Sequence, residues 1–143
     1  MRRTIFILAA LALPPLAFSR PVAAESLVLG PYVGVLACAD CPGIRTELTL
    51  RRKAAGWAEG AYKLTETYLD RGPPEVTEGE WTTLRGDAVN EDAVVYELDP
   101  DKPDRARHFE KVDEKSVRAL SRDLEPPPPD TPSLLTLKTK KRR

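Results

Sequence analysis

The chain has 143 residues, with 22 basic and 22 acidic side chains and a formal net charge of zero, and its length suits one domain. Hydrophobic residues make up 41% and charged residues 31%, which is the composition of a globular protein and excludes an intrinsically disordered chain. Of the 14 prolines, four form one run, so much of the excess belongs to a connecting segment.

Residues 1–24 have the features of a cleaved secretory signal peptide. Two arginines precede an apolar stretch from Ile5 to Leu16, and Val22 and Ala24 are the small residues that signal peptidase accepts before its cut. The apolar stretch contains two prolines and is shorter than the roughly 20 residues that a transmembrane helix needs. We therefore expect cleavage after Ala24, export to the periplasm or the cell exterior, and no transmembrane span.

Leu36-Ala37-Cys38 resembles the end of a lipoprotein cleavage box. Such a box directly follows the apolar stretch of a signal peptide, whereas here the charged residues Arg20 and Glu25 intervene. We therefore expect Cys38 to lie in the folded domain, and we predict no lipid anchor.

The charge of the exported part is unevenly distributed. Beyond residue 24 the chain has 19 basic and 22 acidic residues, and five of the basic ones stand in a C-terminal tail, residues 138–143. The body, residues 25–137, therefore has a net charge of −8. An acidic body argues against nucleic-acid binding, which requires a basic surface, and is compatible with collecting cations.

The body is predicted to be one β-domain. Ile44–Arg51 places Ile44, Leu48 and Leu50 on one face and polar residues on the other, which is typical of a strand half-buried in an antiparallel sheet. Trp57–Leu69 follows after a short turn, and the two segments are predicted to pair as an antiparallel hairpin.

Further short strands are predicted on both sides of this hairpin: Tyr32–Ala37, Val76–Leu84, Ala93–Leu98, Arg107–Val112, Ser116–Leu120 and Leu134–Leu137. Residues 125–132 contain the proline run and are predicted to be a stiff connector before the last strand. A short helical turn within Asp113–Asp123 is an alternative for that segment. Short strands at this spacing predict an all-β barrel or sandwich.

The only two cysteines stand in Cys38-Ala39-Asp40-Cys41. Two thiolates at this spacing can bind a soft ion such as monovalent copper, can close a disulfide in an oxidising compartment, or can exchange disulfides as an oxidoreductase. The last function normally requires a helix after the first cysteine, and a strand is predicted here, so we place it third. A structural disulfide in so short a loop contributes at most about 2 kcal/mol. Metal binding and an inert disulfide both remain open from the residues alone.

A copper site often includes Met or His in addition to Cys. Beyond the signal peptide the chain has no Met and one His, His108, which stands on a predicted strand and which we expect to be packed rather than a ligand. We therefore predict that Cys38 and Cys41 bind Cu(I) alone, or with help from Asp40 or a partner. The four-ligand set of a zinc site is missing.

Enzymatic activity is not expected, because the sequence has no Gly-rich phosphate loop, nucleophile elbow or HExxH motif. An alternative function is a carrier of a small apolar ligand, in which the cysteine pair is only a disulfide. Aromatic side chains would then line the mouth of a barrel, although their ordinary role is core packing: Tyr32, Trp57, Tyr62, Tyr68, Trp81 and Tyr96.

The segment from Tyr32 to Leu50 contains the pattern C-A-D-C-P-G-I followed by an alternating strand. This segment resembles the signature of the N-terminal domain of the NlpE family of copper-resistance and envelope-stress lipoproteins, with Ala37 in place of the usual Pro. The likeness continues more weakly through Tyr62-Lys63-Leu64, Gly79-Glu80-Trp81 and Tyr96-Glu97-Leu98.

The resemblance implies a small lipocalin-like antiparallel meander barrel in the periplasm, with a role in copper homeostasis or the envelope stress response. It also implies a metal ion or an envelope protein as the partner. Members of the family are lipid-anchored, and the long form has a second domain with its own cysteine pair. We expect neither feature here, so we do not expect surface sensing by a tethered two-domain mechanism.

Overall fold

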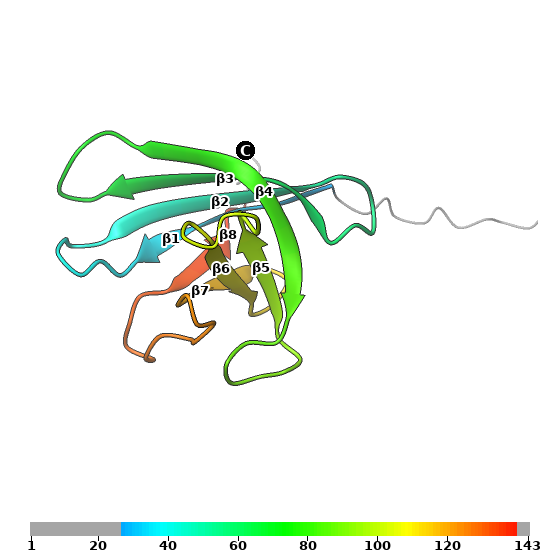
Figure 1. Cartoon of the computed structure of the whole chain (residues 1–143). Helices are drawn as coiled ribbons and strands as arrows, with labels where there is room; N and C mark the ends of the chain where they lie inside the picture. Colours follow the sequence, from blue (N-terminus) through cyan, green and yellow to red (C-terminus); the bar gives the residue numbers. More distant parts are fainter. Residues whose placement is uncertain (1–26, 140–143) are drawn as a thin grey trace, which may run out of the picture.

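The computed structural model describes residues 27–139, which form a closed antiparallel β-barrel (Figure 1). Each strand pairs with its neighbours in the sequence, and the last strand closes the barrel against the first. The predicted all-β, single-domain meander barrel is confirmed. The eight strands are β1 Val28–Leu36, β2 Ile44–Arg52, β3 Glu59–Tyr68, β4 Glu75–Arg85, β5 Val94–Leu98, β6 Arg107–Lys111, β7 Ser116–Leu120 and β8 Leu134–Leu137.

The predicted hairpin is the best-defined part of the sheet. β2 and β3 pair antiparallel along their length, from Ile44 opposite Tyr68 to Arg52 opposite Gly60. Leu48 and Leu50 of β2 are fully buried, because the period-2 alternation directs them to the barrel interior.

The structure corrects one expectation, the short helical turn, and does not describe the segments on which two others rest. The short helical turn considered within Asp113–Asp123 is wrong, because Ser116–Leu120 is β7 and pairs with both β6 and β8. Val117 in this strand is fully buried, so barrel packing holds the segment extended. The expected signal peptide and the last four residues of the basic tail lie outside the described residues.

Side chains fill the interior of the barrel. The core contains Trp81 and Tyr96, whose rings meet edge to face with centroids 5.5 Å apart, an arrangement that adds to the stabilisation from burial. Tyr32 and Tyr62 are buried with them. Trp57, by contrast, is 51% exposed on the β2–β3 turn. Most of the aromatic residues therefore pack the core.

The connections between strands alternate between the two ends of the barrel, because each strand runs opposite to the one before. The β1–β2, β3–β4, β5–β6 and β7–β8 connections consequently share one end. We call this end the loop end. The proline-rich segment 125–132 belongs to the β7–β8 connection, and the carbonyl of Pro132 accepts a hydrogen bond of 2.8 Å from the Ala37 amide.

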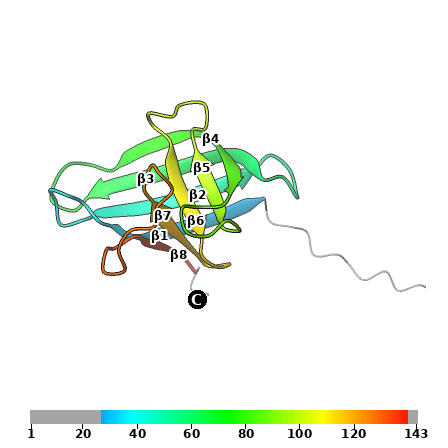
Figure 2. The same ribbon diagram turned by 60° about the horizontal axis from the view of Figure 1, so that its bottom comes forward.

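β4 is a long curved strand that arches over the other strands (Figures 1 and 2). β3 pairs with its first part, from Glu75 to Thr82, while β5 pairs only from Trp81 onward. Because β5 does not pair with the first part of β4, these two strands diverge at the loop end, and the barrel is splayed there. Within residues 27–139 no helix has the length and apolar character that crossing a membrane would require.

Candidate metal and redox site

The cysteine pair lies in the loop between β1 and β2, at the loop end of the barrel. Cys38 and Cys41 are both partly buried and are joined by a disulfide, with their Cα atoms 5.3 Å apart. The loop sits between two neighbours from distant parts of the chain: its first residue bonds to the proline-rich segment, and its last residue bonds to the end of β3. The β-barrel therefore holds both sulfurs in a short, fixed connection.

Gly43 ends the loop, and no other residue fits this position without a change in the structure. Its φ angle is 153°, and a Cβ atom would lie 2.5 Å from Val35 Cγ1, far inside van der Waals contact. The Gly43 carbonyl also accepts a hydrogen bond of 3.1 Å from the Leu69 amide. The glycine after the second cysteine thus lets the loop return tightly along β1 while it stays attached to β3.

Asp40 adds a carboxylate to the two sulfurs. Its Oδ1 lies 3.4 Å from Cys38 Sγ, and the two Sγ atoms and the carboxylate oxygen all lie within 4.8 Å of one another. Asp40 is exposed at the rim of the loop. These atoms form a compact set of one hard and two soft donor atoms. Asp40 is therefore close enough to help the cysteines bind an ion, as the sequence suggested.

A residue that sequence reasoning missed, Arg71, faces this set from the β3–β4 connection. Its Nη2 lies 3.3 Å from Asp40 Oδ1. Its guanidinium also lies over the ring of Tyr68, 5.3 Å from the ring centroid, and its Nε lies 3.5 Å from Asp70 Oδ1. The contact depends on the register of the β2–β3 hairpin: the pairing of Ile44 with Tyr68, continued past the strand ends, puts position 72, next to Arg71, opposite Asp40.

His108 is not part of the group formed by Cys38, Asp40 and Cys41. It lies on β6, is 9% exposed, and its Nε2 is 3.4 Å from Glu97 Oε1 on the paired strand β5. The histidine is therefore a packed residue of the sheet with a carboxylate neighbour.

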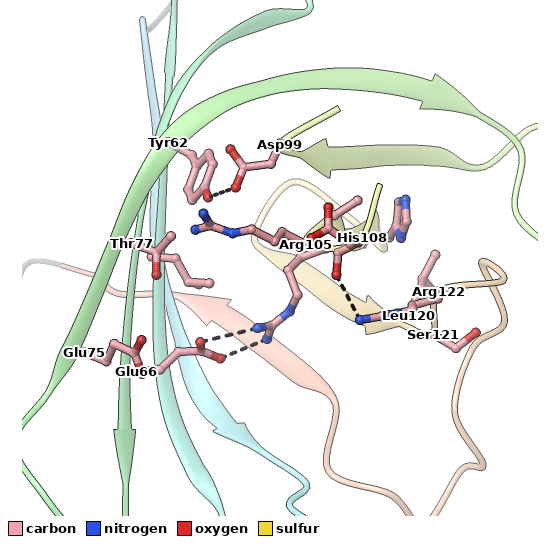
Figure 3. Close-up of a pocket in the computed structure, with 14 residues that line it drawn as sticks. Tyr62, Glu66, Glu75, Thr77, Asp99, Arg105, His108, Leu120, Ser121 and Arg122 are labelled. Atoms are coloured by element: carbon pink, nitrogen blue, oxygen red, sulfur yellow. Dashed lines mark hydrogen bonds and ion pairs between the residues drawn. The ribbon is translucent and has the colours of Figure 1, made fainter. Parts of the chain in front are cut away.

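A separate hollow of about 500 Å³ opens at the splayed side of the loop end (Figure 3). Arg107 lines it and pairs with Glu66 through two contacts of 2.9 and 3.3 Å. Asp104 and Arg105 add further charged groups to its wall. A charged hollow above a filled interior does not suit a small apolar ligand, so this hollow does not support the carrier function.

Tyr62 and Asp99 form the inner wall of this hollow. The Tyr62 hydroxyl donates a hydrogen bond of 2.8 Å to Asp99 Oδ2 (Figure 3). Burial, and then this bond to the carboxylate, raise the pKa of Tyr62 to about 12. The pair keeps the start of the β5–β6 connection against β3.

The fold and the loop together define a small closed β-barrel with a disulfide-bonded Cys-x-x-Cys loop at one end. Comparison with protein families finds the NlpE N-terminal domain over residues 32–128. The chain belongs to this family, and the resemblance noted in its sequence is confirmed. Comparison with curated proteins and with solved structures gave no match.

Proposed function

We propose that this protein is an exported, non-catalytic NlpE-type domain that binds monovalent copper through Cys38 and Cys41 when they are reduced. The observation that carries the proposal is the placement of two sulfurs and a carboxylate oxygen within 4.8 Å of one another on an accessible loop. Thiolate sulfur prefers soft ions, among which Cu(I) is the most relevant. Membership of the NlpE family supports a role related to copper or the cell envelope.

The donor set fits copper only in the reduced protein, because a disulfide offers no thiolate. Reduction by a dithiol reductant transfers two electrons and two protons: the Cys38–Cys41 bond breaks, both cysteines become thiols, and the reductant becomes a disulfide. The thiol protons then leave when a metal ion binds. The same pair is thus a redox-sensitive site, which can bind a metal ion when the cysteines are reduced and cannot when they form the disulfide.

The barrel has a supporting part in this function. Gly43 lies close to Val35 of β1, and its carbonyl bonds to the Leu69 amide, so the end of the cysteine loop is attached to the sheet on both sides. The proposed setting is the periplasm, reached by cleavage of residues 1–24, and the proposed partner is a metal ion or an envelope protein.

The test compares three states of one protein: reduced, air-oxidised, and reduced with both thiols alkylated. Each is titrated with Cu(I) without oxygen, against a chromophoric Cu(I) chelator. The proposal expects about one ion bound per reduced protein and none in the other two states. Equal binding by the reduced and alkylated protein would place the copper elsewhere and overturn the proposal.

A further inference from the structure

We propose that Arg71 sets the metal selectivity of the Cys38–Cys41 pair by pairing with the Asp40 carboxylate and so competing with a bound ion for it. This inference rests on the proposed function, because it requires that the reduced cysteines bind metal. It concerns a different residue and a different property, namely the preference for monovalent copper over divalent zinc.

Arg71 is held in place on several sides. Its guanidinium lies over the Tyr68 ring and beside the carboxylate of Asp70, while its Nη2 reaches Asp40 Oδ1 at 3.3 Å. The Arg71 amide also donates a hydrogen bond of 3.4 Å to the Tyr68 carbonyl, which keeps the turn after β3 closed. The arginine therefore faces Asp40 from a fixed turn.

Asp40 stands between this arginine and the sulfurs. The same oxygen, Oδ1, lies 3.3 Å from Arg71 Nη2 and 3.4 Å from Cys38 Sγ. A carboxylate oxygen that is paired with a guanidinium is less available to a metal ion. While Asp40 is paired in this way, a bound ion is held mainly by the two sulfurs.

The number of ligands decides which ion such a site favours. Cu(I) binds well to soft thiolates alone, whereas zinc takes four ligands and accepts carboxylate oxygen as one of them. Release of Asp40 would add an oxygen that zinc uses more than Cu(I) does. The charge of Arg71 acts in the same direction, because it repels a divalent ion twice as strongly as a monovalent one at the same distance.

The exposure of the Arg71–Asp40 ion pair determines how much its loss should change the zinc affinity. The side chains of Arg71 and Asp40 are 51% and 77% exposed, and exposed ion pairs are weak. Loss of the pair should therefore raise zinc affinity by only about two- to fivefold. The Cu(I) affinity should change by less than the zinc affinity does, because Cu(I) prefers thiolate to carboxylate ligands.

The experiment measures zinc and Cu(I) affinities of the reduced protein by competition with chromophoric chelators, for the wild type and for Arg71→Gln. The matched control is Arg45→Gln, which removes the same charge from an exposed arginine of β2 that pairs with Val35 and Thr67 in the sheet. A third variant, Arg71→Gln with Asp40→Asn, removes the freed carboxylate. We expect the zinc gain in Arg71→Gln only, and its loss in the double variant.

Two results would overturn the inference: an unchanged ratio of zinc to Cu(I) affinity in Arg71→Gln, or the same gain in Arg45→Gln, which would make it a general charge effect. Either result, together with Cu(I) binding that depends on the cysteines, would leave the proposed function standing. A reduced wild type that binds neither ion would overturn both.

Discussion

The hydroxyl of Tyr62 on β3 donates a hydrogen bond of 2.8 Å to the carboxylate of Asp99, which lies 37 residues further along the chain and is 5% exposed. We predict that Tyr62→Phe lowers the free energy of unfolding by about 1.5–3 kcal/mol, since a hydrogen bond to a charged, buried group is lost. Urea denaturation measures this difference. Tyr68→Phe is the matched control, because the structure shows no hydrogen bond from the Tyr68 hydroxyl among residues 27–139, and it should change stability by well under 1 kcal/mol.

The Tyr62–Asp99 pair makes the stability of the protein depend on pH. Burial and the bond to Asp99 raise the pKa of Tyr62 to about 12, above the usual value near 10. The stability that this tyrosine contributes is therefore complete below about pH 10 and is lost as the pH rises through about 12. Between these values the wild type should lose stability more steeply than Tyr62→Phe, and parallel curves for the two proteins would contradict this assignment.

Gly43→Ala should destabilise the protein and disturb the cysteine loop. The added Cβ would lie 2.5 Å from Val35 Cγ1, so we expect a loss of about 1–3 kcal/mol. Gly56→Ala is the control: Gly56 also has a positive φ, of 78°, but nothing lies within 4 Å of its Cβ position. Thermal unfolding of both variants should show the larger loss for Gly43→Ala, and adding Val35→Ala should recover part of it.

The processing prediction concerns the N-terminus and Cys38. We expect the mature protein to begin at Glu25, with no lipid on Cys38. Lipidation of Cys38 would require a cut directly before it, which would remove β1, Val28–Leu36, and with it the closure of the barrel between β1 and β8. Intact-mass measurement on the exported protein decides: a diacylated Cys38 or a retained Met1 would show the prediction to be wrong.

The variant His108→Ala tests whether His108 packs in the sheet or binds the metal ion. The imidazole is 9% exposed and lies against Glu97, so its removal should lower stability by about 1–3 kcal/mol. Since His108 is outside the group of Cys38, Asp40 and Cys41, Cu(I) affinity should stay within about threefold of the wild type. A much larger loss of affinity in a variant that remains folded would identify His108 as a ligand.

The strands could be predicted from the sequence because the signals are local. Alternation of apolar and polar residues, together with turns rich in Gly, Pro and Asp, located every strand to within a few residues. The exception is the start of β1, which was expected at Tyr32 and lies at Val28. Gly30-Pro31 interrupts the strand pattern there, and the sheet accommodates it with a shift of register between Leu29 and Tyr32.

Contacts between distant segments could not be predicted in the same way. The cysteine pair was visible as a motif, but its redox state depends on the compartment and not on the residues. Arg71 was missed because its contact with Asp40 requires the register of the β2–β3 hairpin, which alternation alone does not give. The packing of the aromatic residues in the barrel interior likewise depends on closure between β1 and β8.

The most direct test of the central claim is a Cu(I) competition titration of the reduced mature protein beside Cys38→Ser, Cys41→Ser and the double-serine variant. We predict about one Cu(I) bound by the wild type and a loss of binding in each serine variant, with circular dichroism showing an unchanged barrel. A double-serine variant that binds Cu(I) as tightly as the wild type would contradict it.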